Sequence, residues 1–189
     1  MPRRTGRTCG ARLMAALLLA GLLSGCATTI QDRNETIMPS KTPLGGFAVV
    51  VMRPLTVEKM EGDAGDLDAV RHIETTLRQC MRAVFSGITF GTDAGAPAAA
   101  GQALLIEPAI VDLKKVGGAE RFWVGPMAGS SAALLRMRFS DAHTQAVLAE
   151  PIFYGKASAW GGAWTFGATD NAMLSRLTSD ACVYSRSNM

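Results

Sequence analysis

The first 26 residues narrow most strongly what this chain of 189 residues can fold into, because they do not have the composition of a domain. Four arginines precede an apolar run from Leu13 to Leu23, and the small residues Ser24 and Gly25 follow it, before Cys26. A basic start, a short apolar run and small residues at its end are typical of a secretory signal that is removed. We therefore expect the folded part to lie after residue 25.

Cys26 separates three interpretations of this segment. An apolar run of about 11 residues is too short for a transmembrane anchor, since a bilayer core needs about 20. Small residues directly before the cysteine disfavour an ordinary signal with a chance cysteine. Leu23 to Cys26 resembles the lipobox of bacterial lipoproteins, in which the cysteine becomes the first mature residue. The resemblance implies a diacylglycerol on its sulfur, an acyl chain such as palmitate on its amine, and stable membrane anchoring.

Removal of the signal also changes the charge of the protein. The full chain has 19 basic and 16 acidic residues, but four arginines and no acidic residue precede Cys26. The mature chain then has 15 basic and 16 acidic residues, a net charge of −1. Nucleic-acid binding requires a basic face, so we expect no nucleic-acid partner. The residue after Cys26 is Ala27 and not aspartate, which resembles the signal for export of a lipoprotein to the outer membrane. We therefore expect the protein to be anchored in the outer membrane and to face the periplasm.

The mature chain divides into two parts. Residues 27–46, ATTIQDRNETIMPSKTPLGG, are polar, end in Pro and Gly, and have neither a helical nor a strand period. We therefore predict a signal peptide at 1–25, a lipidated N-terminus with a flexible tether at 26–46, and a single periplasmic domain at 47–189. A domain of this length can bury a core of its own.

The hydrophobic pattern of the domain predicts a strand, a helix, three strands and a second helix. The strands are expected at 47–52, 103–116, 131–140 and 146–158, and the helices at 66–85 and from about 169 onward. The second helix should turn its apolar side to the core, with Met173 or Leu174, Leu177, Ala181 and Tyr184.

Residues 141–145 form the expected turn of an antiparallel hairpin, which would bring Glu150 near Arg136 or Arg138. One apolar side on each helix favours an α+β fold. We expect a two-layer sandwich, with two helices on one face of a mostly antiparallel sheet of about four strands.

Four stretches of this domain resemble a known family. They are IEPAIVDLKK at 106–115, GGAERFWVGPMAGSSA at 117–132, MRFSDAHTQAVLAEPIFY at 137–154 and AWTFGATDNAM at 163–173. They resemble the bacterial lipoproteins grouped as domain of unknown function 4410. This resemblance implies an envelope location and a domain of sheet and helices, and it implies no particular reaction.

Two cysteines remain for pairing. Cys9 leaves with the signal and Cys26 is taken by lipid, so Cys80 and Cys182 are left in an oxidising compartment. They can form a disulfide if their α-carbons come within about 7 Å. The alternative is two reduced thiols that pack as small hydrophobic groups.

The sequence shows no arrangement typical of an enzyme or a metal site. His72 and Cys80 lie eight residues apart on the first predicted helix, about 12 Å along its axis, which is too far for a base and a nucleophile. His143 falls in the hairpin turn and is expected at the surface. HExxH, CxxC and EF-hand patterns are absent from the sequence, so we predict no metal and no cofactor.

The stretch GPMAGSS at 125–131 is the other place where chemistry could be sought. It lacks the lysine of a phosphate-binding loop and the second glycine of GxSxG. Its small residues favour a tight turn. A serine hydrolase with Ser130 or Ser131 as nucleophile is therefore the least favoured function.

Aromatic residues gather in one part of the chain. Eight of the twelve lie between Phe122 and Phe166, including all three tryptophans. Tryptophan and arginine are enriched at binding hot spots, so we take Arg121, Trp123, Trp160 and Trp164 as a candidate binding surface. The alternative is that tryptophans cover an open end of the sheet as part of the core.

These observations predict a lipid-anchored protein of the cell envelope that acts as a non-enzymatic interaction or structural module. Its expected partners are the membrane, through the lipid on Cys26, and an envelope protein. The alternative is a binder of a small or lipidic ligand near Trp123, Trp160 and Trp164.

Overall fold

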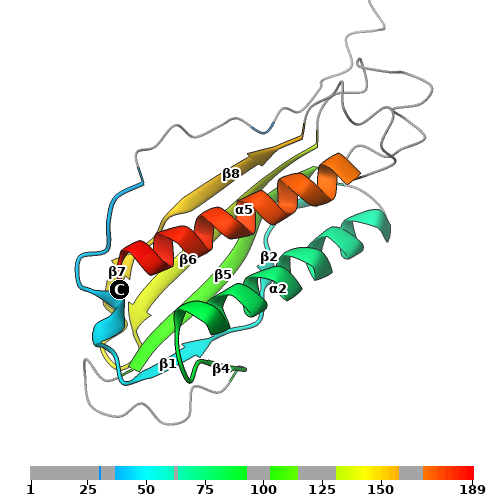
Figure 1. Cartoon of the computed structure of the whole chain (residues 1–189). Helices are drawn as coiled ribbons and strands as arrows, with labels where there is room; N and C mark the ends of the chain where they lie inside the picture. Colours follow the sequence, from blue (N-terminus) through cyan, green and yellow to red (C-terminus); the bar gives the residue numbers. More distant parts are fainter. Residues whose placement is uncertain (1–29, 31–36, 62–63, 93–102, 115–130, 158–167) are drawn as a thin grey trace, which may run out of the picture.

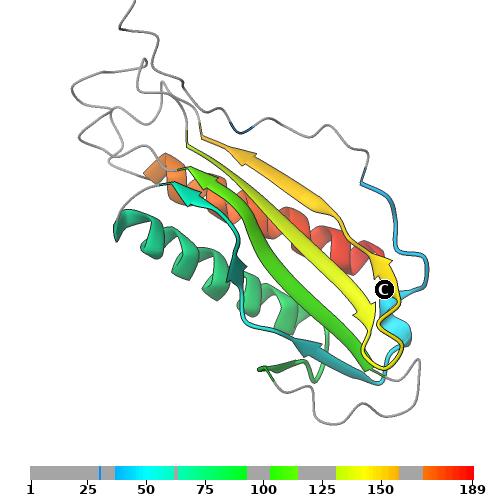
Figure 2. The ribbon, with the colours of Figure 1, turned by 180° about the vertical axis from the view of Figure 1, so that it is seen from behind.

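Two long helices lie side by side on one face of a single β-sheet (Figure 1). The computed structural model describes residues 30, 37–61, 64–92, 103–114, 131–157 and 168–189. Helix α2 spans Ala64–Val84 and helix α5 spans Ala168–Ser187. Seen from behind, the other face of the sheet carries no helix among the described residues (Figure 2). Both predicted helices are confirmed within two residues at their described ends.

Within the described residues the sheet contains eight strands, and five of them lie side by side in the order β4-β1-β5-β6-β7. Strands β2 and β3 continue the path of β1 beside β5, and β8 pairs with β6 beyond β7. The strands are β1 (Val49–Met52), β2 (Thr56–Val57), β3 (Met60–Glu61), β4 (Thr89–Phe90), β5 (Ala103–Lys114), β6 (Ala132–Asp141), β7 (Val147–Ala149) and β8 (Ile152–Lys156).

The prediction of a mostly antiparallel sheet of about four strands is wrong in the number and the direction of the strands. β1 pairs in parallel with both β4 and β5, and β2 and β3 also run parallel to β5. The parallel pairing follows from α2, because a helical crossover returns the chain to the end of the sheet from which it started. The pairs of β6 with β5, β7 and β8 are antiparallel, as expected.

Prolines interrupt the strands on both sides of the central pair β5 and β6. Pro54 separates β1 from β2, and Pro151 separates β7 from β8. Proline has no N–H group, so it cannot donate to a sheet ladder. The flanking backbone keeps the register, because Arg53 N donates to Ile106 O at 2.9 Å and Met137 N donates to Pro151 O at 3.0 Å. The single strand predicted at 146–158 is therefore two strands.

The core lies between the helices and the sheet. Ala69, Ile73, Leu77 and Met81, four residues apart along α2, are at most 3% exposed. The residues of α5 that were predicted to face the core, Leu177, Ala181 and Tyr184, are buried. Met173 and Leu174, which were alternatives in the prediction, are both buried. β1, β5, β6, β7 and β8 supply the facing side chains, which are Val50, Met52, Leu104, Ile106, Ile110, Leu113, Ala133, Leu135, Met137, Phe139, Ala149 and Phe153.

A disulfide joins the two helices. Cys80 of α2 and Cys182 of α5 are bonded, with their α-carbons 6.2 Å apart. The bond closes a loop between residues 102 positions apart in the sequence. A cross-link over that length restricts the unfolded chain strongly, which stabilises the native state.

Replacement of both cysteines, Cys80→Ala with Cys182→Ala, is expected to lower the free energy of unfolding by about 2–5 kcal/mol. Urea unfolding, followed by circular dichroism, measures the change. Reductant should lower the midpoint of the wild type and leave that of the double variant unchanged. Equal midpoints for the two proteins under oxidising conditions would show that the disulfide does not stabilise the fold.

Candidate functional site

Several residues singled out from the sequence lie outside the described part of the structure. They are Cys26, Arg121, Trp123, Ser130, Trp160 and Trp164. Lipidation and the aromatic binding surface therefore stay predictions.

The other candidates for chemistry lie apart from one another in the fold. Ser131, next to β6, is 1% exposed, and its carbonyl accepts a hydrogen bond from Ala157 N at 2.9 Å. His143 is exposed in the hairpin turn, where its backbone N–H donates to the Asp141 carboxylate at 2.8 Å. His72 lies between the helices, with Nε2 2.9 Å from the hydroxyl of Ser175. We interpret the pair of His72 and Ser175 as a contact between helices α2 and α5.

Charged residues connect neighbouring strands across the helix-free face of the sheet. Glu107 of β5 lies directly opposite Arg138 of β6, and Oε2 of Glu107 is 3.7 Å from Nη1 of Arg138. Arg53, which follows β1, donates to Oε1 of the same carboxylate at 2.9 Å. Two arginines therefore share one acidic side chain.

Arg136 is the centre of a second set of ion pairs on this face. Its Nη2 donates to Glu58, between β2 and β3, and its Nε lies 3.4 Å from Oε1 of Glu150. Glu58 can reach over β5 because Ala109, opposite Arg136, has only a methyl group. The pairing of Glu150 with Arg136, predicted from the hairpin, is confirmed.

The centre of this face is a shallow depression with three guanidinium groups. It has a volume of about 190 Å³, and its lining includes Arg53, Arg136, Arg138 and one carboxylate, Glu107. The side chains of the three arginines are 46%, 31% and 39% exposed, so a partner can reach them. Glu58 and Glu150 balance the charge of Arg136, whereas Arg53 and Arg138 share the single carboxylate of Glu107. We call this hollow the arginine depression.

Two of these guanidinium groups have unused donors. Nε of Arg136 and Nε of Arg138 are buried and have no hydrogen-bond partner. Among the described residues, the contact recorded for Arg138 is the one with Glu107, at a distance too long for a hydrogen bond. A guanidinium group has five N–H donors. Since Nε of Arg138 is buried, a bound group can reach only the outer N–H groups of this partly exposed side chain.

The segment before the sheet packs onto the C-terminal helix. Tyr184 of α5 donates its hydroxyl to the carbonyl of Met38 at 2.9 Å. Ser40 N donates to the side-chain oxygen of Asn188 at 2.7 Å, and Leu44 N donates to its backbone oxygen at 2.7 Å. Leu44 begins the short 3-10 helix η2 (Leu44–Gly46) and is fully buried. Residues 38–46, predicted as part of a flexible tether, therefore belong to the folded domain.

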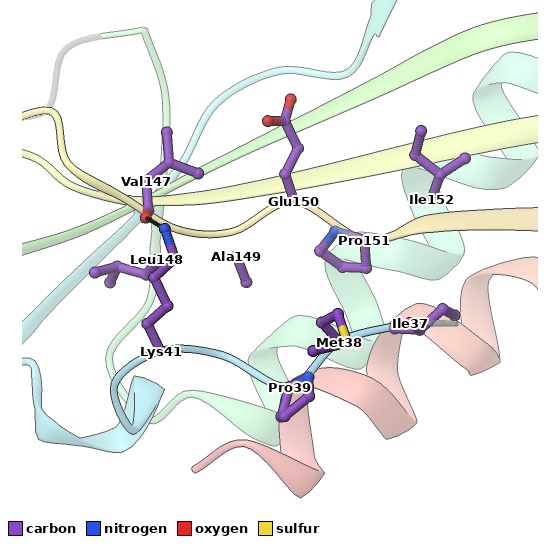
Figure 3. A pocket seen from close by; sticks show the side chains of 10 residues that line it. All are labelled: Ile37, Met38, Pro39, Lys41, Val147, Leu148, Ala149, Glu150, Pro151 and Ile152. Atoms are coloured by element: carbon purple, nitrogen blue, oxygen red, sulfur yellow. Dashed lines mark hydrogen bonds between the residues drawn. The ribbon is translucent and has the colours of Figure 1, made fainter. Parts of the chain in front are cut away.

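An apolar groove separates this segment from the edge of the sheet (Figure 3). Its volume is about 450 Å³, with residues 37–41 on one side and residues 147–152 on the other. Lys41 closes one end, because its N donates to Leu148 O at 3.0 Å and its Nζ donates to Val147 O at 3.3 Å. The Glu150 carboxylate points away from residues 37–41 (Figure 3). We call this hollow the tether groove.

Among the described residues, no group of three His, Cys, Asp or Glu side chains is placed to hold a metal ion. Over the same residues, no helix combines the length and the apolar character that crossing a bilayer requires.

No family model matches the chain, and no curated protein matches it either. Solved structures resemble it distantly. A PelC dodecamer from Paraburkholderia phytofirmans is 14% identical, covers 77% of this chain and 97% of its own, and has a TM-score of 0.46. Protein XCC0632 from Xanthomonas campestris, of family DUF330, is 9% identical and covers 80% and 94%, with a TM-score of 0.43.

A third structure is a putative lipoprotein from Caulobacter crescentus CB15. It is 9% identical and covers 69% of this chain and 88% of its own, with a TM-score of 0.34. A likeness this distant assigns no residue role, and the resemblance to domain of unknown function 4410 stays a prediction.

The sequence predicted neither the arginine depression nor the tether groove. The alternation in β6 predicted Arg136 and Arg138 outward, but no sequence signal placed Arg53 and Glu107 beside them. Pro151 and Lys41 are 110 positions apart in the sequence, so the tether groove has no local pattern.

Tyr184→Phe is expected to lower the free energy of unfolding at pH 7 by about 1 kcal/mol, because the Met38 carbonyl loses its donor. Amide hydrogen exchange at Lys41 should become faster, since the segment loses an attachment point. Ser187→Ala, which removes an exposed hydrogen bond on the same helix, is the control and should leave this exchange unchanged. Unchanged exchange in Tyr184→Phe would contradict the role of the hydroxyl.

The same residue affects stability at alkaline pH. Burial raises the pKa of the Tyr184 hydroxyl above its ordinary value of 10.0, because ionisation is disfavoured away from water. The unfolded chain therefore loses this proton at lower pH than the native protein, and stability falls as pH rises above about 10. Tyr184→Phe should show a smaller fall in urea midpoint between pH 9 and pH 11.

Proposed function

We propose that this chain is a lipid-anchored protein of the outer membrane that faces the periplasm and binds an envelope protein, without catalysing a reaction. The observation that carries the proposal is the arginine depression, where Arg53 and Arg138 share a single carboxylate, Glu107, on an accessible sheet face. The matching group on the partner is a carboxylate, either an acidic side chain or a chain terminus.

The arginines are better suited to recognition than to stability. Exposed ion pairs contribute only about 0–1 kcal/mol each to folding. A guanidinium group presents paired N–H donors that match the two oxygens of a carboxylate. Arg53 and Arg138 both face Glu107, and a second carboxylate could accept hydrogen bonds from the exposed N–H groups of these two side chains.

The position of the anchor supports a partner in the envelope. Cys26 precedes Met38, the first residue of the segment with a hydrogen bond to α5, by 12 positions. A chain of that length spans at most about 40 Å. A lipidated Cys26 would therefore keep the domain within that distance of the bilayer.

Cys26→Ala is expected to move the protein from the membrane fraction to the soluble fraction of disrupted cells, because the acyl chains hold it in the bilayer. Immunoblots of the two fractions, after a carbonate wash, measure the distribution. Ser24→Thr, which leaves the cysteine in place, is the control. Retention of Cys26→Ala in the washed membranes would refute the lipid anchor.

Arg53→Ala combined with Arg138→Ala is expected to weaken the complex with the envelope partner at least tenfold, since buried arginine contacts are typical hot spots. Crosslinking in intact cells, followed by quantitative mass spectrometry, compares the captured proteins. Arg176→Ala, an exposed arginine on α5, is the matched control. If the double variant and the wild type captured the same proteins in equal amounts, the arginine depression would not be the binding surface.

A further inference from the structure

We infer that the tether groove binds an acyl chain of the protein's own lipidated N-terminus. The inference rests on the proposed function, because it requires acylation of Cys26. It adds an intramolecular lipid site that lies on a different part of the molecule from the arginine depression.

The walls of the groove have the chemistry of a site for an alkyl chain. On the segment side the apolar lining residues are Ile37, Met38 and Pro39, and on the sheet side they include Leu148, Pro151 and Ile152. Two charged residues, Lys41 and Glu150, also line the groove; Lys41 lies at one end, and the Glu150 carboxylate points away from residues 37–41 (Figure 3). Ile37 is 43% exposed and Met38 is 70% exposed, so much apolar surface faces water when the groove is empty. Covering that surface with hydrocarbon is favourable.

Four carbonyls on the groove walls already accept hydrogen bonds. The carbonyls of Met38, Val147, Leu148 and Pro151 each accept a hydrogen bond within the protein. Pro39 and Pro151 have no N–H to offer. A peptide bound as an added strand would need free donors and acceptors on the groove walls. An alkyl chain needs none, so these four carbonyls and two prolines favour a lipid over a peptide on this part of the walls.

The tether is long enough to bring the lipid to the groove. Cys26 and Ile37 are 11 positions apart, which allows a reach of about 36–40 Å when the chain is extended. A ligand attached through a flexible linker has an effective concentration in the millimolar range. Its covalent attachment therefore gives the protein's own acyl chain an advantage over free fatty acids in the periplasm.

One chain in the groove is compatible with membrane anchoring. A lipidated and N-acylated cysteine has three acyl chains, and two are sufficient for stable attachment. With one chain in the groove and two in the bilayer, the β7–β8 edge of the sheet would stand next to the membrane surface.

Photo-crosslinking of the lipidated protein tests the inference. Cells are fed a palmitate analogue with a diazirine and an alkyne, membranes are irradiated, and the purified protein is digested and analysed by mass spectrometry. We expect the N-terminal lipopeptide to be joined to a peptide that contains residues 37–41 or 147–152. Groove peptides joined to phospholipid, with none joined to the lipopeptide, would overturn the inference.

Ile37→Asp combined with Met38→Asp should reduce this crosslink at least tenfold, because two carboxylates would face the alkyl chain. Both native side chains are exposed, and urea unfolding checks that the fold is kept. Leu67→Asp with Val183→Asp is the matched control, since these apolar side chains are 50% and 60% exposed on α2 and α5. An equal crosslink in both double variants would also overturn the inference.

The experiment separates this inference from the proposed anchor. If the peptide that contains Cys26 acquires no label, the lipid anchor itself is refuted, and the inference fails with it. If that peptide is labelled and no groove peptide is joined to it, only the inference fails.

Discussion

The packing of two apolar helix faces on one side of the sheet is the constraint on which the rest of the structure depends. Because α2 and α5 cover that side, side chains at alternate positions of the central strands β5 and β6 are buried beneath the helices. The alternate side chains of β5 and β6 then lie on the helix-free face, where Glu107, Arg136 and Arg138 are partly exposed. The helices thus determine where a charged recognition surface can form.

Periodicity in the sequence predicted the elements that bury a regular face. α2, α5, β6 and the hairpin turn each have such a pattern, and their positions were predicted closely. β2, β3 and β4 have two residues each, too few for any period, and only their partners in the sheet define them. The parallel direction of β1 depends on the path of α2, which a strand pattern does not contain.

The candidate site was less predictable, because its contacts join distant parts of the chain. Arg136 and Arg138 were predicted outward from their alternation, but Glu58 lies 78 positions before Arg136. The tether groove depends on Tyr184, 146 positions after the carbonyl to which it donates. Tyr184 was predicted to face the core, and its ring does pack against Phe139 and Phe153, while its hydroxyl extends to the segment. The hydrophobic period of α5 predicts that the Tyr184 ring faces the core, but it does not predict the hydrogen bond from the hydroxyl to the Met38 carbonyl.

The place where the segment joins the fold bears on both proposed surfaces. Residues 38–44 are attached to α5, to Asn188 and to β7, all at one edge of the sheet. A segment crossing the helix-free face would cover the arginines, and one crossing the helices would compete with their packing. Entry at the edge leaves Arg53 and Arg138 accessible while the lipid is held close to the bilayer. The same chain can therefore be fixed to a membrane through one edge and bind a partner through a face.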